Sequence, residues 1–527
     1  MNLQKIYDEL KLDYDRHIFI FSFIIVFSIG FLTYGFGYYN LGFSHDALYP
    51  TIKPHGFFQL SIGRPFTSFI YSLFNNYNNK VVIGFTSLLF ISLSVYITVM
   101  LFTKLLDLNF QNKKNLTIIV SVSYLLNISF IILNVSFSYQ VACDMLALLT
   151  ALLAVYFVSF NFSYTKFFIS VLLCTFSIGI YQAYINVFLS LSILVMIINL
   201  YKGFTVKSVL YIGFRYFFIV ILSLLLYLLI WKLLMFKNDI SVSDDYNSPM
   251  KVGYTSINDF LFWVENSIKN TCFSLFRINS FNRPFVCLFN LFCVLILLIG
   301  CIRIIKCLKN IINIILFVFL SILFVISLNI TNIISKNVYH SLMTFSLCFV
   351  CILSYLMLIK SNHKIFRKIF VTWCFVIAFF SANFYNTLSM MKVMELDASY
   401  SNVSRVIQRI ELIPGFNVDR DVIAIEPFEL NKYFNSRTSS IFSKFKEFNG
   451  CSSSVAPTYN PDYFLQFYNL GLKTVNLRYC NNIMNELNLT ETQIKEINNM
   501  KPYPSDSSVK RIGKYIFVKN SYLQYGK

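Results

Sequence analysis

The chain has 527 residues, of which 56% are hydrophobic and 13% are charged, and its formal net charge is +19. Soluble globular domains carry about 25% charged residues, so this composition excludes a soluble globular protein and indicates a polytopic membrane protein. Most of the basic excess lies in short segments between apolar runs, where it sets topology, and no base-stacking or groove-reading motif supports nucleic-acid binding.

About eleven apolar runs approach the roughly 17–25 residues that a membrane-spanning helix requires. No small-residue cleavage pattern follows the first run, so we interpret it as a retained helix and not as a signal peptide. The fifth run is too short to span a bilayer without distortion. In chain order the predicted spans are Ile18–Tyr38, Val81–Phe102, Leu116–Leu133, Phe137–Phe160, Phe167–Ile180, Ala183–Leu200, Val209–Trp231, Phe285–Cys301, Ile311–Ile330, Leu342–Ile359 and Ile369–Phe384.

Basic residues collect on one side of these spans. Cytoplasmic loops are enriched in Lys and Arg, so the amino terminus is expected in the cytoplasm and the carboxyl terminus outside. The outer face then carries the loops 39–80 and 232–284 and the residues after 386, and chemistry is expected there. The basic residues that set this orientation are Lys5, Lys11, Arg16, Lys104, Lys113, Lys114, Lys202, Lys207, Arg303, Lys306, Lys309, Lys364, Arg367 and Lys368.

The first outer loop holds the strongest candidates for chemistry. Asp46 follows His45 just beyond the first span, where a carboxylate stays ionised while facing a cavity, which suits a general base. Arg64, on the same loop, supplies a fixed positive charge that is able to hold a phosphate. The residue types alone also allow a structural interpretation, in which His45 and Asp46 cap the next helix and Arg64 extends to lipid headgroups.

Both large outer loops carry a segment with helical spacing and an Arg-Pro-Phe triplet. Apolar residues recur at this spacing over 65–74 and 259–265, which predicts one interfacial helix in each loop. Arg283 precedes Pro284 as Arg64 precedes Pro65. The second triplet either anchors the chain at the interface or provides a second phosphate contact through Arg283.

A polar group interrupts the fourth span at its outer end. Tyr139, Gln140 and Asp144 lie there, and Asp144 is the only acidic residue well inside an apolar run. An ionisable group at that depth costs about 2.5–3.5 kcal/mol on insertion scales, so Asp144 is expected to face protein or water and not lipid.

The fifth and sixth spans are joined with almost no loop through residues 177–184. Gly179 and the polar pair Tyr181 and Gln182 lie in this junction. It predicts either a sharp re-entrant break whose backbone groups line a cavity, or a tight turn with the polar pair at the interface.

The composition becomes more polar after residue 386, which predicts an α/β domain over 387–527 beyond the transmembrane domain 1–386. About 140 residues are enough to form a core. The elements expected in it are a helix over Met390–Leu412, a strand over Asp421–Ile425, a helix over Tyr463–Tyr468, a strand over Thr474–Arg478, a helix over Glu491–Asn499 and a strand over Tyr515–Lys519.

Cysteine usage predicts no metal site. Nine of the twelve cysteines lie in or beside apolar runs and are expected to be small buried hydrophobes. Cys451 and Cys480 lie in the polar region and are candidates for a disulfide if that region is in an oxidising compartment. Hydrolase-triad, phosphate-loop, zinc-protease and dinucleotide motifs are absent from the sequence.

The segments Gly42-Phe43-Ser44-His45-Asp46, Gly63-Arg64-Pro65 and Gly179-Ile180-Tyr181-Gln182-Ala183 occur in an order that resembles the bacterial O-antigen glucosyltransferases of serotype-converting clusters. The resemblance covers most of the chain. It implies a GT-C-like polytopic helical fold in the Gram-negative inner membrane. The implied partners are an undecaprenyl-phosphate-linked sugar donor and an O-antigen acceptor glycan on the periplasmic side. No cofactor or metal is implied.

The resemblance implies an acidic residue on the first outer loop, and Asp46 is the matching position. In a single displacement with inversion, Asp46 would take the acceptor proton and His45 would position it. Arg64, helped by Arg283 or Lys336, would stabilise the departing polyprenyl phosphate. The residues expected to bind the substrate are Tyr139, Gln140, Asp144, Tyr181 and Gln182.

Two other function classes fit the composition and topology. One is an O-antigen polymerase, although such enzymes usually carry their bulk in an internal loop. The other is a lipid-linked sugar flippase or transporter. A flippase does not require a folded outer domain, and a transporter would place ionisable residues at mid-membrane, where Asp144 is the one candidate in the sequence.

Overall fold

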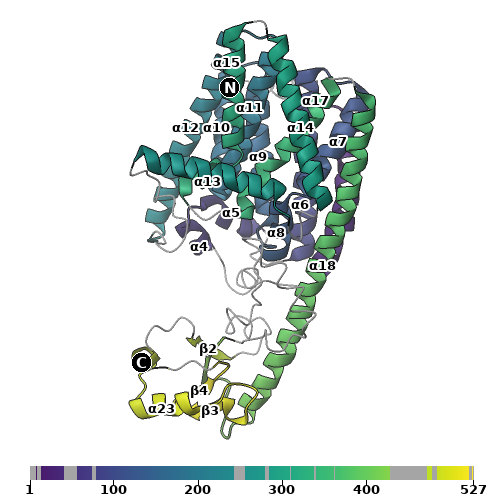
Figure 1. Cartoon of the computed structure of the whole chain (residues 1–527). Coiled ribbons are helices and arrows are strands. Elements are labelled where there is room, and N and C mark those ends of the chain that lie inside the picture. Colours follow the sequence, from purple (N-terminus) through teal and green to yellow (C-terminus); the bar gives the residue numbers. More distant parts are fainter. Residues whose placement is uncertain are drawn as a thin grey trace.

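The computed structural model describes residues 8, 14–40, 56–73, 79–241, 256–278, 284–308, 310–336, 340–360, 363–427, 472–477, 483–521 and 525. Most of them form a bundle of helices, and a small sheet domain lies beyond one end of it (Figure 1). The long helices are α2 (Arg16–Tyr39), α6 (Lys80–Leu106), α7 (Phe110–Leu125), α9 (Val141–Ser159), α10 (Tyr164–Ile180), α11 (Ile185–Tyr201), α12 (Val206–Lys237), α13 (Ile257–Phe276), α14 (Pro284–Cys307), α15 (Ile311–Ser327), α17 (Cys348–Lys360) and α18 (Lys364–Glu411).

Short elements gather at the end of the bundle that faces the sheet domain (Figure 1). They are α4 (Gly56–Ser61), α5 (Pro65–Leu73), α8 (Ile128–Ser136), α16 (Ile330–Ser335) and the 3₁₀ segments η1 (Gln182–Tyr184) and η3 (Ser341–Leu347). The helix α13 runs across the bundle near the same end. The interfacial segments predicted from the sequence are therefore confirmed as helices, α5 and α13.

Within the described residues, eight helices are long and apolar enough to cross a membrane, and a ninth span results if α7 and α8, bent by 45°, are counted as one. The sequence predicted about eleven spans. All eleven segments are mainly helical, but α10 and α15 have only 17 residues each, whereas α11 together with η1 and α17 together with η3 reach 20. Since a bilayer requires about 20 residues, eight or nine spans is the count that the structure supports.

The helices differ in how much of their surface the protein itself covers. The spans that contain α9 and α11 are 83% and 94% buried, whereas those in α12 and α14 are 22% and 28% buried. The first two therefore form the centre, and the others present apolar faces outward. Small polar side chains join the central helices: Ser177 Oγ donates to the Ala147 carbonyl at 2.7 Å, and Ser190 and Ser327 share a hydrogen bond of 3.0 Å.

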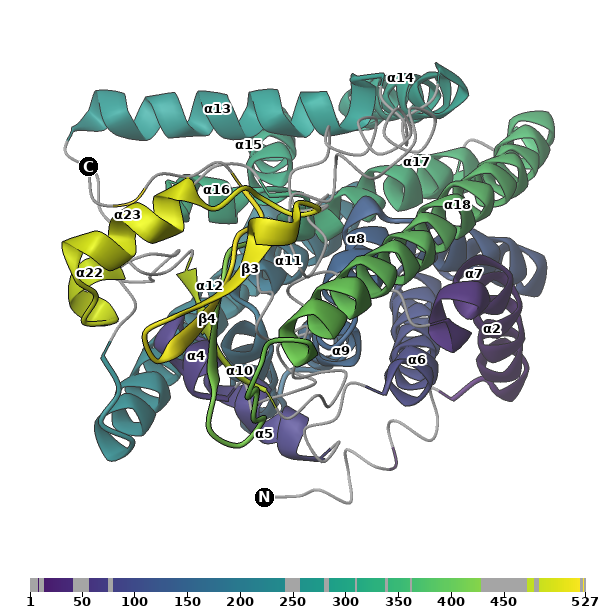
Figure 2. The same ribbon diagram turned by 90° about the horizontal axis from the view of Figure 1, so that it is seen from below.

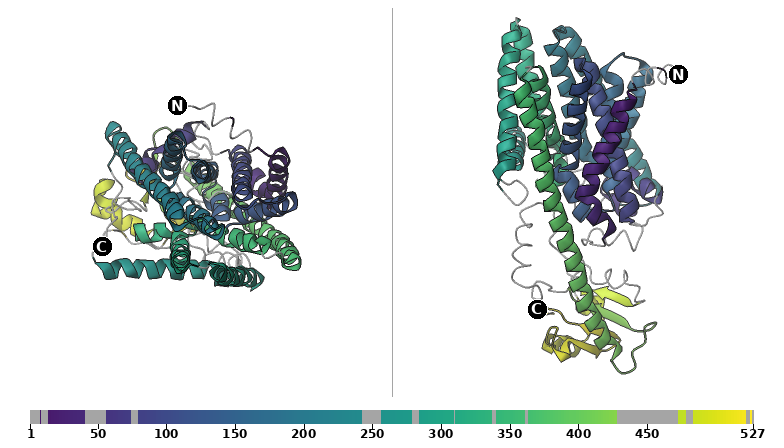
Figure 3. Two further views of the ribbon diagram at one scale, coloured as in Figure 1. Left: turned by 90° about the horizontal axis from the view of Figure 1, so that it is seen from above. Right: turned by 90° about the vertical axis from the view of Figure 1, so that its right-hand side faces the viewer.

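The last helix, α18, has 48 residues, about 70 Å, and runs from the far end of the bundle into the sheet domain (Figure 3). The predicted boundary after residue 386 falls inside it. The predicted span Ile369–Phe384 and the predicted helix Met390–Leu412 are parts of this one helix. No residue that breaks a helix separates them.

The sheet domain has four strands in the order β2-β1-β4-β3. The inner strand β1 pairs in parallel with β2 and β4, and β3 pairs antiparallel with β4. Three of the strands and the helix α23 were predicted, and β3 was not. The predicted helix Tyr463–Tyr468 lies outside the described residues. The elements are β1 (Val422–Ile425), β2 (Lys473–Asn476), α22 (Ile483–Glu486), α23 (Glu491–Asn499), η6 (Asp506–Ser508), β3 (Val509–Ile512) and β4 (Tyr515–Val518).

Of the nine cysteines expected to be buried, five are buried, three are half-buried and Cys307 is exposed. Cys307 is the last residue of α14 and therefore lies beyond the covered part of that helix. Cys451 and Cys480 lie outside the described residues.

Candidate functional site

Arg64 lies in the short turn between α4 and α5, at the end of the bundle that faces the sheet domain. Its Nη1 atom donates hydrogen bonds to Gln59 Oε1 and to Gln140 Oε1, both at 3.2 Å. The guanidinium carbon lies 4.5 Å from the centre of the Tyr181 ring. Three segments far apart in the sequence therefore hold this one guanidinium in a fixed orientation.

The turn that carries Arg64 is itself held by polar side chains from two other elements. Gly63 has a φ of 84°, a left-handed conformation that favours glycine. Its carbonyl accepts hydrogen bonds from Gln182 Nε2 at 2.6 Å and from the Tyr227 hydroxyl at 2.8 Å. Trp231 Nε1 donates to the Leu60 carbonyl at 2.8 Å. These bonds use backbone acceptors at the end of α4 and so fix where α5 begins.

Gln140 links Arg64 to Asp144. The Gln140 side chain is 2% exposed, and its Nε2 atom donates to Asp144 Oδ1 at 3.4 Å while its Oε1 atom accepts from Arg64. Asp144 lies in the first turn of α9 and is completely buried, so of the two surroundings expected from the sequence, protein or water, it faces protein. The amide thus connects a buried carboxylate to a half-buried guanidinium without direct contact between the two charges.

We call Arg64 and the residues around it, Gln59, Tyr71, Gln140, Asp144 and Tyr181, the Arg64 cluster. Several polar atoms of this cluster have no partner within the described part of the chain. Asp144 Oδ2 and Arg64 Nε are both buried and make no hydrogen bond there. The same is true of the Tyr71 hydroxyl, whose ring lies 5.8 Å from that of Tyr139. A buried polar atom without a partner costs about 1–3 kcal/mol, so such atoms gathered at one place are typical of a site that binds a polar ligand.

The positive charge of Arg64 is not neutralised by an ion pair among the residues that the structure describes. Its three contacts, Gln59, Gln140 and Tyr181, are neutral. Amide oxygens and an aromatic face orient a guanidinium and leave its charge available to an anion. The arrangement is therefore suited to binding a phosphate or carboxylate.

His340 belongs to the same end of the bundle and was not among the predicted site residues. It precedes η3, its Nδ1 accepts a hydrogen bond from the Leu342 amide at 3.2 Å, and its ring makes an edge contact with Phe137. Burial, together with the nearby positive charge of Arg64, lowers the pKa of His340 to about 4. Because Nδ1 accepts, the neutral ring carries its proton on Nε2 and is a donor.

The sequence carried no local signal for His340, because it lies in a polar segment before a span, where histidine has no insertion cost. Gln59, which is 1% exposed, lies in the first outer loop and was missed because no neighbouring residue indicates its burial.

The structure brings five of the predicted site residues into one place: Arg64, Gln140, Asp144, Tyr181 and Gln182. Tyr139 is their neighbour through Tyr71. Lys336 makes an ion pair of 2.5 Å with Asp259 of α13. Asp46, His45 and Arg283 lie outside the described residues. Within the described residues, no group of three His, Cys, Asp or Glu side chains is placed to hold a metal ion.

A family model described as glucosyl transferase GtrII matches residues 35–381, which is more than half of the chain. The chain belongs to the GtrII glucosyl transferase family. No curated protein and no solved structure matched it. The matched range contains the whole Arg64 cluster, and the four-stranded sheet lies beyond it.

Membership of the GtrII family makes this chain a membrane glucosyltransferase of the serotype-converting group, which glucosylates O-antigen. Such an enzyme requires a sugar donor and an acceptor glycan. The family supports a transferase over the flippase and polymerase alternatives that the sequence had left open.

Proposed function

We propose that this GtrII enzyme transfers glucose from undecaprenyl-phosphate glucose to O-antigen repeats on the periplasmic side of the inner membrane. The observation that carries the proposal is the Arg64 guanidinium, oriented by neutral groups and lying at the ends of membrane helices. A lipid-linked donor presents its phosphate at that depth, where its tail remains in the bilayer.

Arg64 would bind the donor phosphate. As the bond between the anomeric carbon and the phosphate oxygen breaks, negative charge grows on the departing polyprenyl phosphate. A guanidinium that is already oriented stabilises this charge without reorganisation, and removing one such group typically costs about 100- to 1000-fold in rate. Asp144 Oδ2 and the Tyr71 hydroxyl, both without partners in the described chain, supply an acceptor and a donor for sugar hydroxyls.

Asp46 would act as the general base. The acceptor hydroxyl loses its proton to the Asp46 carboxylate and forms a bond to the anomeric carbon from the side opposite the phosphate, so the configuration at that carbon inverts. His45 would position the carboxylate. No metal is needed in this scheme, because one phosphate monoanion or dianion is compensated by arginine.

The test is to express Arg64→Ala, Arg64→Lys and Asp46→Asn in a strain with a defined O-antigen and to measure glucosylation of the polysaccharide. We expect Arg64→Ala to lose at least 100-fold and Arg64→Lys to retain a small part, because lysine keeps the charge but not the forked geometry. Asp46→Asn should insert normally and add no glucose.

The matched control is Arg215→Ala. Arg215 also lies over aromatic rings, those of Phe162 and Tyr211 at 4.3 and 4.2 Å, but belongs to the other end of the bundle. We expect it to keep near-normal activity. Full glucosylation by Arg64→Ala would remove Arg64 from the phosphate site, and full glucosylation by Asp46→Asn would remove Asp46 as the base.

A further inference from the structure

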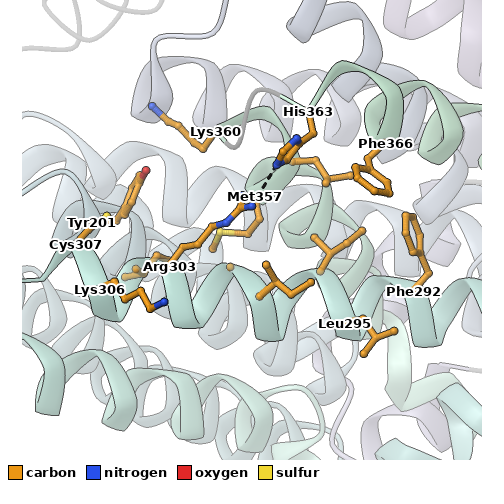
Figure 4. Close-up of a pocket in the computed structure, with 15 residues that line it drawn as sticks. Tyr201, Phe292, Leu295, Arg303, Lys306, Cys307, Met357, Lys360, His363 and Phe366 are labelled. Atoms are coloured by element: carbon orange, nitrogen blue, oxygen red, sulfur yellow. Dashed lines mark hydrogen bonds between the residues drawn. The ribbon is translucent and has the colours of Figure 1, made fainter.

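A cavity lined by both basic and apolar side chains lies at the end of the bundle opposite to the Arg64 cluster. This cavity, of about 560 Å³, is formed between the second half of α14, the end of α17 and the beginning of α18, with the last residue of α11 at its side (Figure 4). Two inner helical segments, η1 with α11 and η3 with α17, begin near Arg64 and end at this cavity. The cavity and the Arg64 cluster are therefore about one membrane-helix length apart.

The cavity has an apolar wall and a cationic rim. Its wall includes Phe292, Leu295, Ile299 and Met357. Leu295 and Ile299 are 48% and 52% exposed and lie on α14, which is largely uncovered by the rest of the protein. The wall therefore continues onto a face of the bundle that would contact lipid chains, and the cavity opens sideways toward the bilayer.

Four basic side chains form the rim: Arg303, Lys306, Lys360 and His363. Arg303 Nη2 lies 3.2 Å from His363 Nε2, which must accept this hydrogen bond because a guanidinium only donates (Figure 4). In the described part of the chain, no carboxylate forms an ion pair with Arg303, Lys306 or Lys360. Three positively charged side chains thus line one end of an apolar cavity, and His363 accepts a hydrogen bond from one of them, Arg303.

We propose that this cavity binds an anionic phospholipid, with its phosphate between Arg303, Lys306 and Lys360 and one acyl chain along the α14 wall. An isolated phosphate would have no use for the apolar wall. A zwitterionic lipid brings its own positive charge to a rim that already carries three. Basic pockets between membrane helices commonly bind the headgroups of anionic lipids, and each Lys or Arg near a lipid surface contributes measurable attraction.

The proposal is tested with the full-length protein in detergent, by native mass spectrometry after titration with phosphatidylglycerol, phosphatidylcholine or inorganic phosphate. We expect phosphatidylglycerol to remain bound at concentrations where phosphatidylcholine does not. The double variant Arg303→Gln/Lys360→Gln should weaken phosphatidylglycerol binding by about tenfold or more. The matched control, Lys364→Gln/Lys368→Gln, removes the same charge from exposed positions at the same end and should change binding less than twofold.

Three outcomes would overturn the proposal: equal retention of phosphatidylglycerol by the double variant and the control, competition by inorganic phosphate at millimolar concentration, or a preference for polyprenyl phosphate over phosphatidylglycerol. The last would assign the cavity to the product lipid. Thermal unfolding of each variant checks that it is folded. If the double variant does not fold, Lys360→Gln alone provides the comparison, with about a threefold loss expected.

Discussion

Two arginines of this chain are held in opposite ways, and the difference separates a binding group from a structural one. Arg511 in β3 makes a forked pair with Asp421, with N–O distances of 3.0 and 2.7 Å, and this pairing holds the pKa of Asp421 well below its usual range. The charge of Arg511 is therefore neutralised by a carboxylate of the protein itself. Among the described residues, Arg64 is oriented by two amides and a ring and pairs with no carboxylate, so its charge is left for a ligand.

The lowered pKa of His340 predicts a pH dependence of stability. Between pH 6.5 and about 4 the imidazole is neutral in the folded protein but protonated when the chain unfolds, so the unfolded state binds more protons and stability falls as the pH is lowered through this window. We expect the thermal midpoint in detergent to fall between pH 7 and pH 4.5, and to fall less in His340→Gln. His363→Gln is the control, and an equal change in both variants would contradict the prediction.

At the scale of elements, the site depends on how α5 packs against the end of α10. The Thr67 hydroxyl donates to the Ile180 carbonyl at 3.1 Å, and the Phe66 ring lies 5.0 Å from Phe176 and directly over Gly179. The carbonyl that Thr67 satisfies is freed by the break between α10 and η1. Thr67 of α5 thus satisfies an acceptor at the break, and Gln182 just after the break donates to the Gly63 carbonyl before α5. An irregular backbone at membrane depth requires such partners.

Gly179→Ala tests this packing. An added Cβ would lie 2.4 and 2.6 Å from two Phe66 ring carbons, so the ring must move and carry the start of α5, two residues from Arg64, with it. We expect glucosylation to fall at least tenfold with normal membrane insertion, and the double variant Gly179→Ala/Phe66→Leu to recover part of it. Gly35→Ala, whose Cβ would meet nothing closer than 3.4 Å, is the control and should stay near normal. Unchanged activity in Gly179→Ala would show that α5 does not position Arg64.

The sequence predicted most elements because two signals were strong. An apolar run of about 20 residues requires a helix, and a polar residue within such a run requires a buried partner, which is how Gln140, Asp144 and Gln182 were found. The strand β3 was missed because its sequence, Val-Lys-Arg-Ile, has too little apolar character to predict a strand. His340 and Gln59 were missed because nothing local distinguishes them; their burial results from packing between distant segments.

At the scale of the whole molecule, the two proposed binding sites lie at opposite ends of the helix bundle. The helices α4 and α5, which flank Arg64, and the sheet domain lie at one end of the bundle (Figure 1). The basic side chains of the α14 cavity lie at the other end, on the last turns of α14 and α17. Viewed from below, the sheet domain lies in front of the ends of α10 and α12 (Figure 2). It lies beyond the bundle at the end of α18, on the same side as α4 and α5 (Figure 1). We therefore expect the domain to bind or guide the acceptor glycan.

Arg409 offers a way to test that expectation without deleting the domain. On the last turn of α18, its Nη1 donates to the Ser505 carbonyl at 2.5 Å and to Ser508 Oγ at 3.1 Å, and its guanidinium lies 5.1 Å from the centre of the Tyr503 ring. These contacts fix the sheet to the helix. We expect Arg409→Ala to increase amide hydrogen exchange in β3 and to raise KM for the acceptor several-fold, with donor binding unchanged.

Arg405→Ala is the matched control, because Arg405 lies one turn earlier and its hydrogen bond within the described part of the chain is to Ser401 of the same helix, at 3.2 Å. Removing it changes the same charge but no contact between helix and sheet, so KM should stay within twofold of the wild type. A deletion of Ser399–Lys527 that kept full activity would refute a role for the domain in acceptor binding. An Arg409→Ala enzyme with faster exchange but an unchanged KM would separate domain attachment from acceptor recognition and leave the bundle alone as the acceptor site.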